Sequence, residues 1–402
     1  MGADHSMTNI RNLNKKRVLL RAPLLTISGY GVHSRQIFDY LNNRSDVDLT
    51  VQLLNWGNTS WMINSDLEGG MIGQIMQCSK ELSKQPYDLS VQVQLPDEWD
   101  HKIAHKNIGI SAFVETDKCN PAWVDKCNLM SEIIVPSSFL KEVINNSGKT
   151  ATPINVVHEH FNKYLVKNSH NTTLDLKLNK KFNFLILGQL TGNNKDNDRK
   201  NTVNMIKWFC EAFHDNPNVG LVLKTNLGRC TLRDRTETVK AAKSIINNFR
   251  KGKYPIVEVL HGNMTSEEIA ELYKNKNIKC ILSATRGEGY GLPLVDAAAS
   301  GLPIVATGWS GHMDFLNKEC ISSLDYELKP IHESRIDNRI FMKGAKWAEV
   351  ESSEFKNKIL DVYENYSKSK KKAQRMQQDV RSNFSREAVF KRYDEIIGKY
   401  LS

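Results

Sequence analysis

Two acidic residues around a glycine-rich loop have the clearest chemical potential in this sequence. Glu288 lies between glycines, and Asp296 follows eight positions later. The apolar run at 280–282 predicts a buried strand before the loop, and Pro293 with small apolar residues after it predicts a helix start. Backbone N–H groups at a helix start bind anions, and nearby carboxylates bind hydroxyls. The segment therefore suits a ligand that carries both phosphate and hydroxyl groups.

A second group of charges points to the same kind of ligand. Arg199 and Lys200 stand at the start of a predicted amphipathic helix. Cations at a helix N-terminus oppose the helix dipole, so their presence suggests that an anion shares the site, although a charged surface is the alternative. Lys224 follows a predicted strand at 219–223 and places another cation at a strand end.

A glycine turn near the N-terminus is a weaker candidate. Gly29, Tyr30 and Gly31 lie between a predicted strand at 17–21 and a predicted helix at 32–41. The arrangement resembles a dinucleotide fingerprint, but no acidic residue ends a second strand at the usual distance. A turn without a ligand and a loop that faces phosphate both remain open.

Two further groups have a chemical and a plain structural interpretation. The apolar strand predicted at 108–114 delivers Glu115 to its carboxyl end, where ligands sit in open α/β sheets. Glu115 would act on a substrate hydroxyl or merely cap a turn. The triplet at 158–160, His-Glu-His, invites a metal interpretation, but three adjacent residues cannot all face one ion. We therefore predict no metal site.

The composition predicts a globular protein with two α/β halves. The chain has 402 residues, 40% hydrophobic and 25% charged, and strands alternate with helices as in a doubly wound parallel sheet. No run of apolar residues is long enough for a membrane span. The seven cysteines include no C-x-x-C pair, which favours reduced thiols and a cytoplasmic location. Residues before Met7 look like an expression tag.

The excess positive charge lies in the second half of the chain. The net charge is +10, yet residues 1–170 hold 17 basic and 17 acidic side chains, against 38 and 28 in the rest. Residues 356–402 hold 12 basic and 6 acidic side chains, including the run at 370–372. This stretch is either a solvated helix face or a surface for an anionic partner such as a membrane or nucleic acid.

These residues together resemble a known enzyme family. Residues 288–303 look like the E-x7-E signature of the retaining GT-B glycosyltransferases of family 4, with Asp296 in the second acidic place. The segment Arg199-Lys200-Asn201 resembles the R-K-N/G element of the same family. The resemblance covers almost the whole chain. It implies two Rossmann-like domains that face a central cleft.

The resemblance also implies a division of the chain. Residues 7–165 would form the acceptor-binding domain, and the polar, aperiodic stretch 166–181 would be a linker. Residues 182–383 would bind the nucleotide-sugar donor, with a helix expected at 347–367. A C-terminal helix within 384–402 would pack back towards the N-terminal domain.

Family roles carry over residue by residue. Glu288 would contact donor-sugar hydroxyls, Asp296 would contact the ribose, and Lys200 with Arg199 would neutralise the departing nucleoside diphosphate. Glu115 completes the expected catalytic group. The other residues expected at the donor are Gly29, Tyr30, Gly31, Lys224, Gly262, Asn263, Gly289, Tyr290, Gly291 and Leu292.

Several positions depart from the family pattern. Gln189 stands where many members carry a phosphate-binding arginine, so Arg199 or Lys224 would have to compensate. Many members place a histidine after the strand that precedes Glu115. The triplet at 158–160 replaces a commoner P-H-G segment.

The resulting expectation is a retaining, metal-independent enzyme that moves a hexose from a UDP- or GDP-sugar to a hydroxyl. The acceptor would be a saccharide, lipid-linked or polymeric molecule, with peripheral membrane contact through the basic stretch compatible with it. No cofactor is expected beyond the donor substrate. The alternatives are a modified nucleic-acid base as acceptor, disfavoured by the neutral first part, and a non-catalytic nucleotide-sugar-binding protein.

Overall fold

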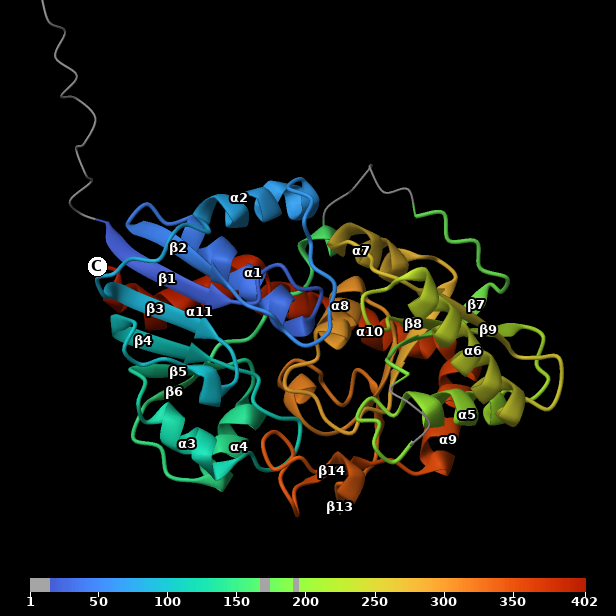
Figure 1. Ribbon diagram of the computed structural model, residues 1–402. Coiled ribbons are helices and arrows are strands. Elements are labelled where there is room, and N and C mark those ends of the chain that lie inside the picture. The colour runs from blue at the N-terminus through green and yellow to red at the C-terminus, as the bar shows by residue number, and fades with distance from the viewer. Residues whose placement is uncertain (1–14, 167–173, 191–194) are drawn as a thin grey trace, which may run out of the picture.

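Two parallel six-stranded sheets form the framework of the computed structural model, which describes residues 15–166, 174–190 and 195–402 (Figure 1). The first sheet has the order β2-β1-β3-β4-β5-β6, and every neighbouring pair is parallel. Its strands are β1 (Lys16–Ala22), β2 (Val47–Leu53), β3 (Tyr87–Val93), β4 (Ala104–Ile110), β5 (Glu132–Val135) and β6 (Ile154–Val156).

The second sheet repeats this construction with the order β12-β11-β10-β7-β8-β9, again parallel throughout. Parallel neighbours require long crossovers, and helices supply most of them. The predicted α/β class with two doubly wound sheets is therefore confirmed. The strands are β7 (Phe182–Leu187), β8 (Val219–Thr225), β9 (Ile256–His261), β10 (Ile278–Ser283), β11 (Ile304–Thr307) and β12 (Ser322–Leu324).

Amphipathic helices cover the sheets, and several begin at the caps that their sequences favour. The helix after Thr265 starts with a capping box in which Thr265 and Glu268 bond to each other's backbone N–H. None of the helices in the described ranges is long and apolar enough to cross a membrane. The helices are α1 (Gly29–Asn42), α2 (Met71–Cys78), α3 (Pro121–Cys127), α4 (Ser138–Ser147), α5 (Thr202–Ala212), α6 (Leu232–Phe249), α7 (Ser266–Lys274), α8 (Leu292–Ser300), α9 (Ser352–Glu364), α10 (Tyr366–Asn383) and α11 (Arg386–Ile397).

The end of the chain returns to the first sheet. In Figure 1, the red helix α11 lies beside the blue strands and α1. Val389, Tyr393 and Ile397 on α11 are buried in the same apolar cluster as the inward side chains of β1 and α1. Helix α11 thus links the two halves, because it follows the second sheet in sequence and packs against the first.

A second excursion runs from the second half to the first. Residues 326–350, which we call the arm, include the antiparallel pair β13 (Glu327–Pro330) and β14 (Lys346–Glu349). Phe341 and Trp347 on the arm are buried with Trp123 in the apolar cluster of the first half. The arm therefore spans both halves (Figure 1).

Several predicted elements have different bounds. The helix expected at 347–367 is wrong at its start, because residues 346–349 pair as β14 and α9 begins at Ser352. The strand expected at 108–114 ends at Ile110, so Glu115 lies in the following loop. The expected linker at 166–181 falls partly outside the described residues.

Candidate active site

Glu288 lies at the centre of a network of charges between the two sheets. One of its carboxylate oxygens accepts a bond from Lys200 Nζ at 2.6 Å and from Thr285 Oγ1 at 3.0 Å. The other lies 3.3 Å from an Arg199 guanidinium nitrogen. Burial alone would raise the pKa of Glu288, but Lys200 and Arg199 outweigh burial and lower it to about 2. Glu288 is therefore a buried, fully ionised acceptor.

Arg199 connects the two halves through this network. Its guanidinium lies 3.3 Å from Glu115, which the loop after β4 presents, and donates to the carbonyl of Gly287 at 2.6 Å. Asn201, just before α5, adopts a left-handed conformation with φ of 57°. The structure thus brings together Glu288, Lys200, Arg199 and Glu115, the four residues that the family resemblance assigns to the catalytic centre.

The N-terminus of α8 adjoins the network and is open to an anion. Within the described ranges, no protein acceptor contacts the backbone N–H groups of Gly289–Leu292. Gly291 is the residue before the helix and has φ of 104°, which side chains disfavour. Unbonded N–H groups at a helix start attract negative charge. This end of α8 can therefore bind phosphate oxygens through the backbone.

Asp296 lies about one turn into α8 and is nearly buried. One of its oxygens accepts a bond from the backbone N–H of Asn162 at 2.7 Å. Burial raises the pKa of Asp296 to about 7, and the Asn162 contact only partly opposes that rise. Glu288 and Asp296, eight positions apart, therefore differ sharply in proton affinity.

Lys224 lies inside β8 rather than after it. The strand predicted at 219–223 therefore ends two residues too early. Lys224 Nζ donates to Asn226 Oδ1 and to the carbonyl of Gly262, each at 2.7 Å. Burial lowers the pKa of Lys224 to about 8. The side chain of the neighbouring Asn263 accepts a bond from Asn226. Lys224, Gly262 and Asn263 therefore form one connected group.

The N-terminal glycine turn divides into residues with different surroundings. Gly29 is exposed, and a side-chain carbon added there would meet nothing within 4 Å. A carbon added at Gly31 would lie 2.1 Å from the carbonyl oxygen of Thr26, so close packing alone explains that glycine. The Tyr30 hydroxyl accepts the backbone N–H of Ala112 at 2.9 Å. The helix expected at 32–41 begins earlier, at Gly29. Of the two glycines of this turn, Gly29 borders open space and Gly31 does not.

Tyr290 and Gly289 are also engaged in packing. The Tyr290 side chain is buried in the core of the second half, and its hydroxyl donates to the carbonyl of Glu159 at 2.6 Å. Gly289 faces Ala112 across the two halves, and its carbonyl accepts a bond from Ser137 at 2.7 Å. Tyr290 and Gly289 can therefore contact a ligand only through their backbone N–H groups.

The loop after β11 supports the site, although sequence reasoning had not singled it out. Ser310 has φ of 85°, and its hydroxyl accepts the backbone N–H of Glu288 at 2.9 Å. The buried His312 bonds through Nε2 to the carbonyl of Thr307 at 2.7 Å. Both residues fix the shape of the Glu288 loop. Small and polar residues of this kind give no periodic signal in a sequence, so only the fold reveals their role.

The His-Glu-His triplet points in three directions. His158 bonds to Asp314 at 3.0 Å, whereas Glu159 lies 4.0 Å from His33. His160 Nδ1 bonds to the carbonyl of the next residue. In the described part of the chain, no group of three or more potential ligand side chains could hold a metal ion.

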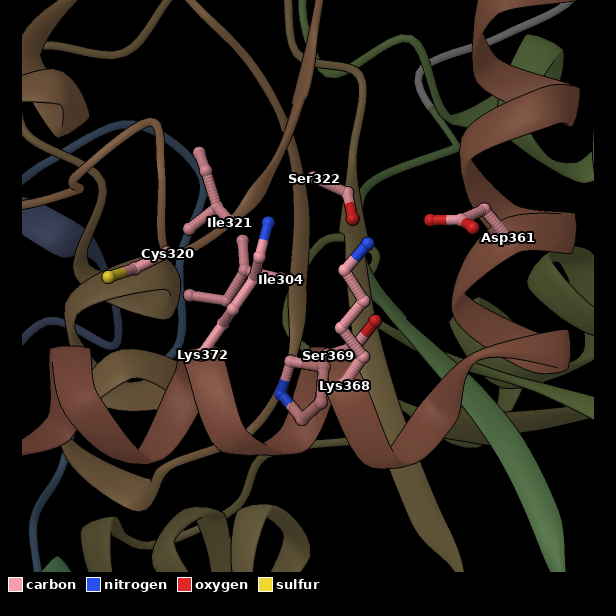
Figure 2. A pocket seen from close by; sticks show the side chains of 9 residues that line it. Ile304, Cys320, Ile321, Ser322, Asp361, Lys368, Ser369 and Lys372 are labelled. Carbon is pink, nitrogen blue, oxygen red and sulfur yellow. The ribbon is translucent and has the colours of Figure 1, made fainter.

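A separate pocket lies away from these residues, between α10 and the strands β11 and β12, of which β12 is at the edge of the sheet (Figure 2). Lys368, Ser369 and Lys372 of α10 line it together with Ser322 and Asp361. Its cavity volume is about 40 Å³, room for only a few water molecules and far below that of a nucleotide site. It does not compete with the Glu288 network as the candidate active site.

Comparison with known proteins assigns the family. The model of "Family 4 Glycosyltransferase in conflict systems" matches residues 150–392, more than half of the chain. This chain belongs to that family. It is therefore a glycosyltransferase, as the resemblance of residues 288–303 implies. A search of curated proteins gives no match.

Solved structures agree on the architecture of this glycosyltransferase. HepE of Anabaena, solved with UDP and glucose, has a TM-score of 0.63 at 15% identity over 96% of this chain and 100% of that one. Sucrose-phosphate synthase of Thermosynechococcus elongatus has 0.61 at 12%, over 96% and 99%. The lipopolysaccharide outer core galactosyltransferase WaaB has 0.57 at 13%, over 96% and 99%. These similarities confirm the GT-B fold.

Proposed function

We propose that this glycosyltransferase moves a hexose from a UDP- or GDP-sugar to a hydroxyl of a saccharide, lipid-linked or polymeric acceptor, with retention at the anomeric carbon. The observation that carries the proposal is the cluster of Glu288, Lys200 and Arg199 beside the free N-terminus of α8. The cluster combines cations that can bind a diphosphate with an ionised carboxylate that can accept hydrogen bonds from sugar hydroxyls. The UDP and glucose in the HepE structure support a nucleotide sugar of this kind.

The ion pairs suggest how the donor would engage. Lys200 pairs with Glu288, and Arg199 pairs with both Glu288 and Glu115. A diphosphate at the start of α8 would offer both cations a more highly charged partner. Glu288 would then accept hydrogen bonds from sugar hydroxyls, while the cations stabilise the charge that grows on the leaving phosphate. Exchange of partners within one preformed network requires little rearrangement of the backbone.

The remaining donor contacts follow from position. Asp296 would bond to the ribose hydroxyls, although its side chain is shorter than glutamate. Lys224, on β8, would face the phosphates. It would take the place of the phosphate-binding arginine that many family members carry at the position of Gln189. Gly29 would let the first half approach the donor closely, because its space is open. Residues 7–165 would then hold the acceptor and residues 182–383 the donor, as the family pattern implies.

Removal of the central charges is the direct test. We expect Glu288→Gln and Lys200→Ala each to lower kcat by about 10²-fold or more, because each removes a group aimed at developing charge or at the sugar. Lys207→Ala is the matched control, since Lys207 lies on α5 and pairs with Glu211 on the surface side. Transfer at the wild-type rate by either active-site variant would contradict the assignment.

A panel of UDP-, GDP- and ADP-sugars identifies the donor. Thermal shift reports binding, and slow hydrolysis reports activation of the donor without an acceptor. A rise in melting temperature with one base and hydrolysis of its sugar would support the proposal. If no nucleotide raises the melting temperature, the non-catalytic interpretation replaces it. Salt-sensitive DNA binding would instead favour a nucleic-acid acceptor.

A further inference from the structure

Arg335 on the arm is a cation without a counter-ion beside the candidate active site. It ends a short 3-10 turn, Glu333–Arg335. Its Nε is fully buried and has no hydrogen-bond partner, and among the described residues no carboxylate forms an ion pair with its guanidinium. Buried polar groups normally have partners, so such a group calls for an explanation.

The arm holds this side chain in place. The Arg335 guanidinium lies over the ring of Phe341, 4.1 Å from its centroid, and Phe341 is itself buried in the first half. Asp117 accepts the backbone N–H of Lys346 at 2.6 Å, and Arg339 bonds to Asp97 at 2.8 Å. Both of these anchors follow Arg335 in the chain, and Ile331 before it is buried in the same apolar cluster as Phe341. The arm is therefore attached to the first half before and after Arg335.

A backbone contact places Arg335 next to the catalytic cluster. The carbonyl of the adjacent Ser334 accepts a bond at 3.3 Å from Asn197, which lies two residues before Arg199. Burial lowers the pKa of Arg335 and Arg199 lowers it further, whereas Glu115, Asp337 and Asp198 raise it. Glu115 and Glu288 already pair with Arg199, and Lys200 pairs with Glu288. Within the described ranges, Arg335 is the cation of this group that forms no ion pair, and Asp198 and Asp337 act on it only from a longer distance.

We propose that Arg335 binds an oxyanion, a carboxylate or phosphate, carried by a substrate next to the reacting centre. A planar guanidinium binds such groups with two parallel hydrogen bonds, and stacking on Phe341 leaves its edge available. The oxyanion is part of the donor sugar, as in a uronic acid, or part of the acceptor. This inference rests on the proposed function and adds that one substrate is acidic beyond the diphosphate.

Inorganic phosphate is the first probe, titrated by calorimetry into protein saturated with UDP so that the diphosphate site is filled. We expect Arg335→Gln to weaken phosphate binding by about tenfold or more, because a charge-assisted bond pair is lost. Arg335→Lys should recover only part of it. Lys343→Gln removes an exposed charge from the same arm and should leave the affinity within about twofold. Equal phosphate affinity in wild type and Arg335→Gln, or none in wild type, overturns the inference.

Two activity ratios distinguish the source of the oxyanion. If the donor sugar carries it, Arg335→Gln lowers hydrolysis of UDP-glucuronic acid relative to UDP-glucose. If the acceptor carries it, the variant lowers transfer to glucose 6-phosphate relative to glucose. Two unchanged ratios overturn the substrate role. Should neither UDP nor GDP bind, the proposed function fails, and phosphate titration of the free protein still decides whether Arg335 binds an oxyanion.

Discussion

Single residues in this site owe their properties to what surrounds them. Glu288 and Asp296 are both buried carboxylates, yet the pKa of Glu288 falls to about 2 while that of Asp296 rises to about 7. The difference is the pair of cations: Glu288 has Lys200 and Arg199 within 3.3 Å, whereas Asp296 has a backbone N–H. Near neutral pH, Glu288 is therefore fully ionised, whereas Asp296 is in the middle of its titration.

This difference predicts a pH profile for UDP binding. Below pH 7 Asp296 is protonated and cannot accept two bonds from ribose hydroxyls, so affinity should rise about tenfold between pH 6 and pH 8. Lys224, with its pKa lowered to about 8, should lose its charge above that pH and cause affinity to fall again. Calorimetry from pH 5.5 to 9 tests both limbs.

Two substitutions distinguish the rise in UDP affinity from its fall at higher pH. Asp296→Asn should abolish the rise, and Lys224→Arg should abolish the fall, because arginine stays charged. A flat profile in the wild-type protein would remove both residues from the nucleotide site.

At the scale of elements, the basic run near the C-terminus has a structural use. Lys370 and Arg381 on α10 bond to the carbonyls of Gly301 and Ala299, at 2.5 and 2.8 Å, where α8 ends. Cations there satisfy free carbonyls and complement the helix dipole. The neighbouring Lys371 is exposed. Part of the positive charge therefore fixes α8, the helix whose other end faces the active site.

This contact predicts a difference between two basic side chains of α10. Arg381→Ala should lower the free energy of unfolding by about 1 kcal/mol, because a charge-assisted bond to the α8 terminus is lost. Lys371→Ala should change it by less than about 0.5 kcal/mol. Urea denaturation of both variants gives the comparison. Equal effects would mean that α10 does not stabilise the end of α8.

At the scale of the molecule, two long-range excursions join the halves. The arm carries Phe341 and Trp347 into the first core, and α11 carries Tyr393 and Ile397 into another cluster of the same half. Arg199 and Glu115 then form an ion pair across the junction. The geometry of the cleft thus depends on segments far from it in sequence.

The dependence on α11 predicts a loss of stability from its buried face. Tyr393 is fully buried, and its hydroxyl lies 3.0 Å from His33 Nε2. Tyr393→Ala should lower the free energy of unfolding by about 3–5 kcal/mol, as for other large buried aromatics, and Tyr393→Phe by about 1 kcal/mol. Lys391→Ala on the exposed face is the control. Thermal or urea unfolding measures all three variants. An unchanged free energy of unfolding in Tyr393→Ala would refute the role of α11.

Local patterns were enough for the class of fold and for the main candidates. Alternation of strands and helices predicted two parallel sheets, and the glycine loop with Pro293 predicted the start of α8. Residue type and spacing alone marked Glu288 and Lys200 as partners for a charged ligand. These features are readable because a strand, a turn and a helix start each depend mainly on neighbours in the chain.

Only the tertiary structure decided which glycines face open space, which acid is ionised and what lies opposite the site. Gly29 and Gly31 look alike in the sequence, but only Gly31 meets Thr26. Arg335 gave no signal at all, because its importance comes from the arm that folds it against the other half. Burial and charge pairing are properties of segments that meet in space, so no local pattern can specify them.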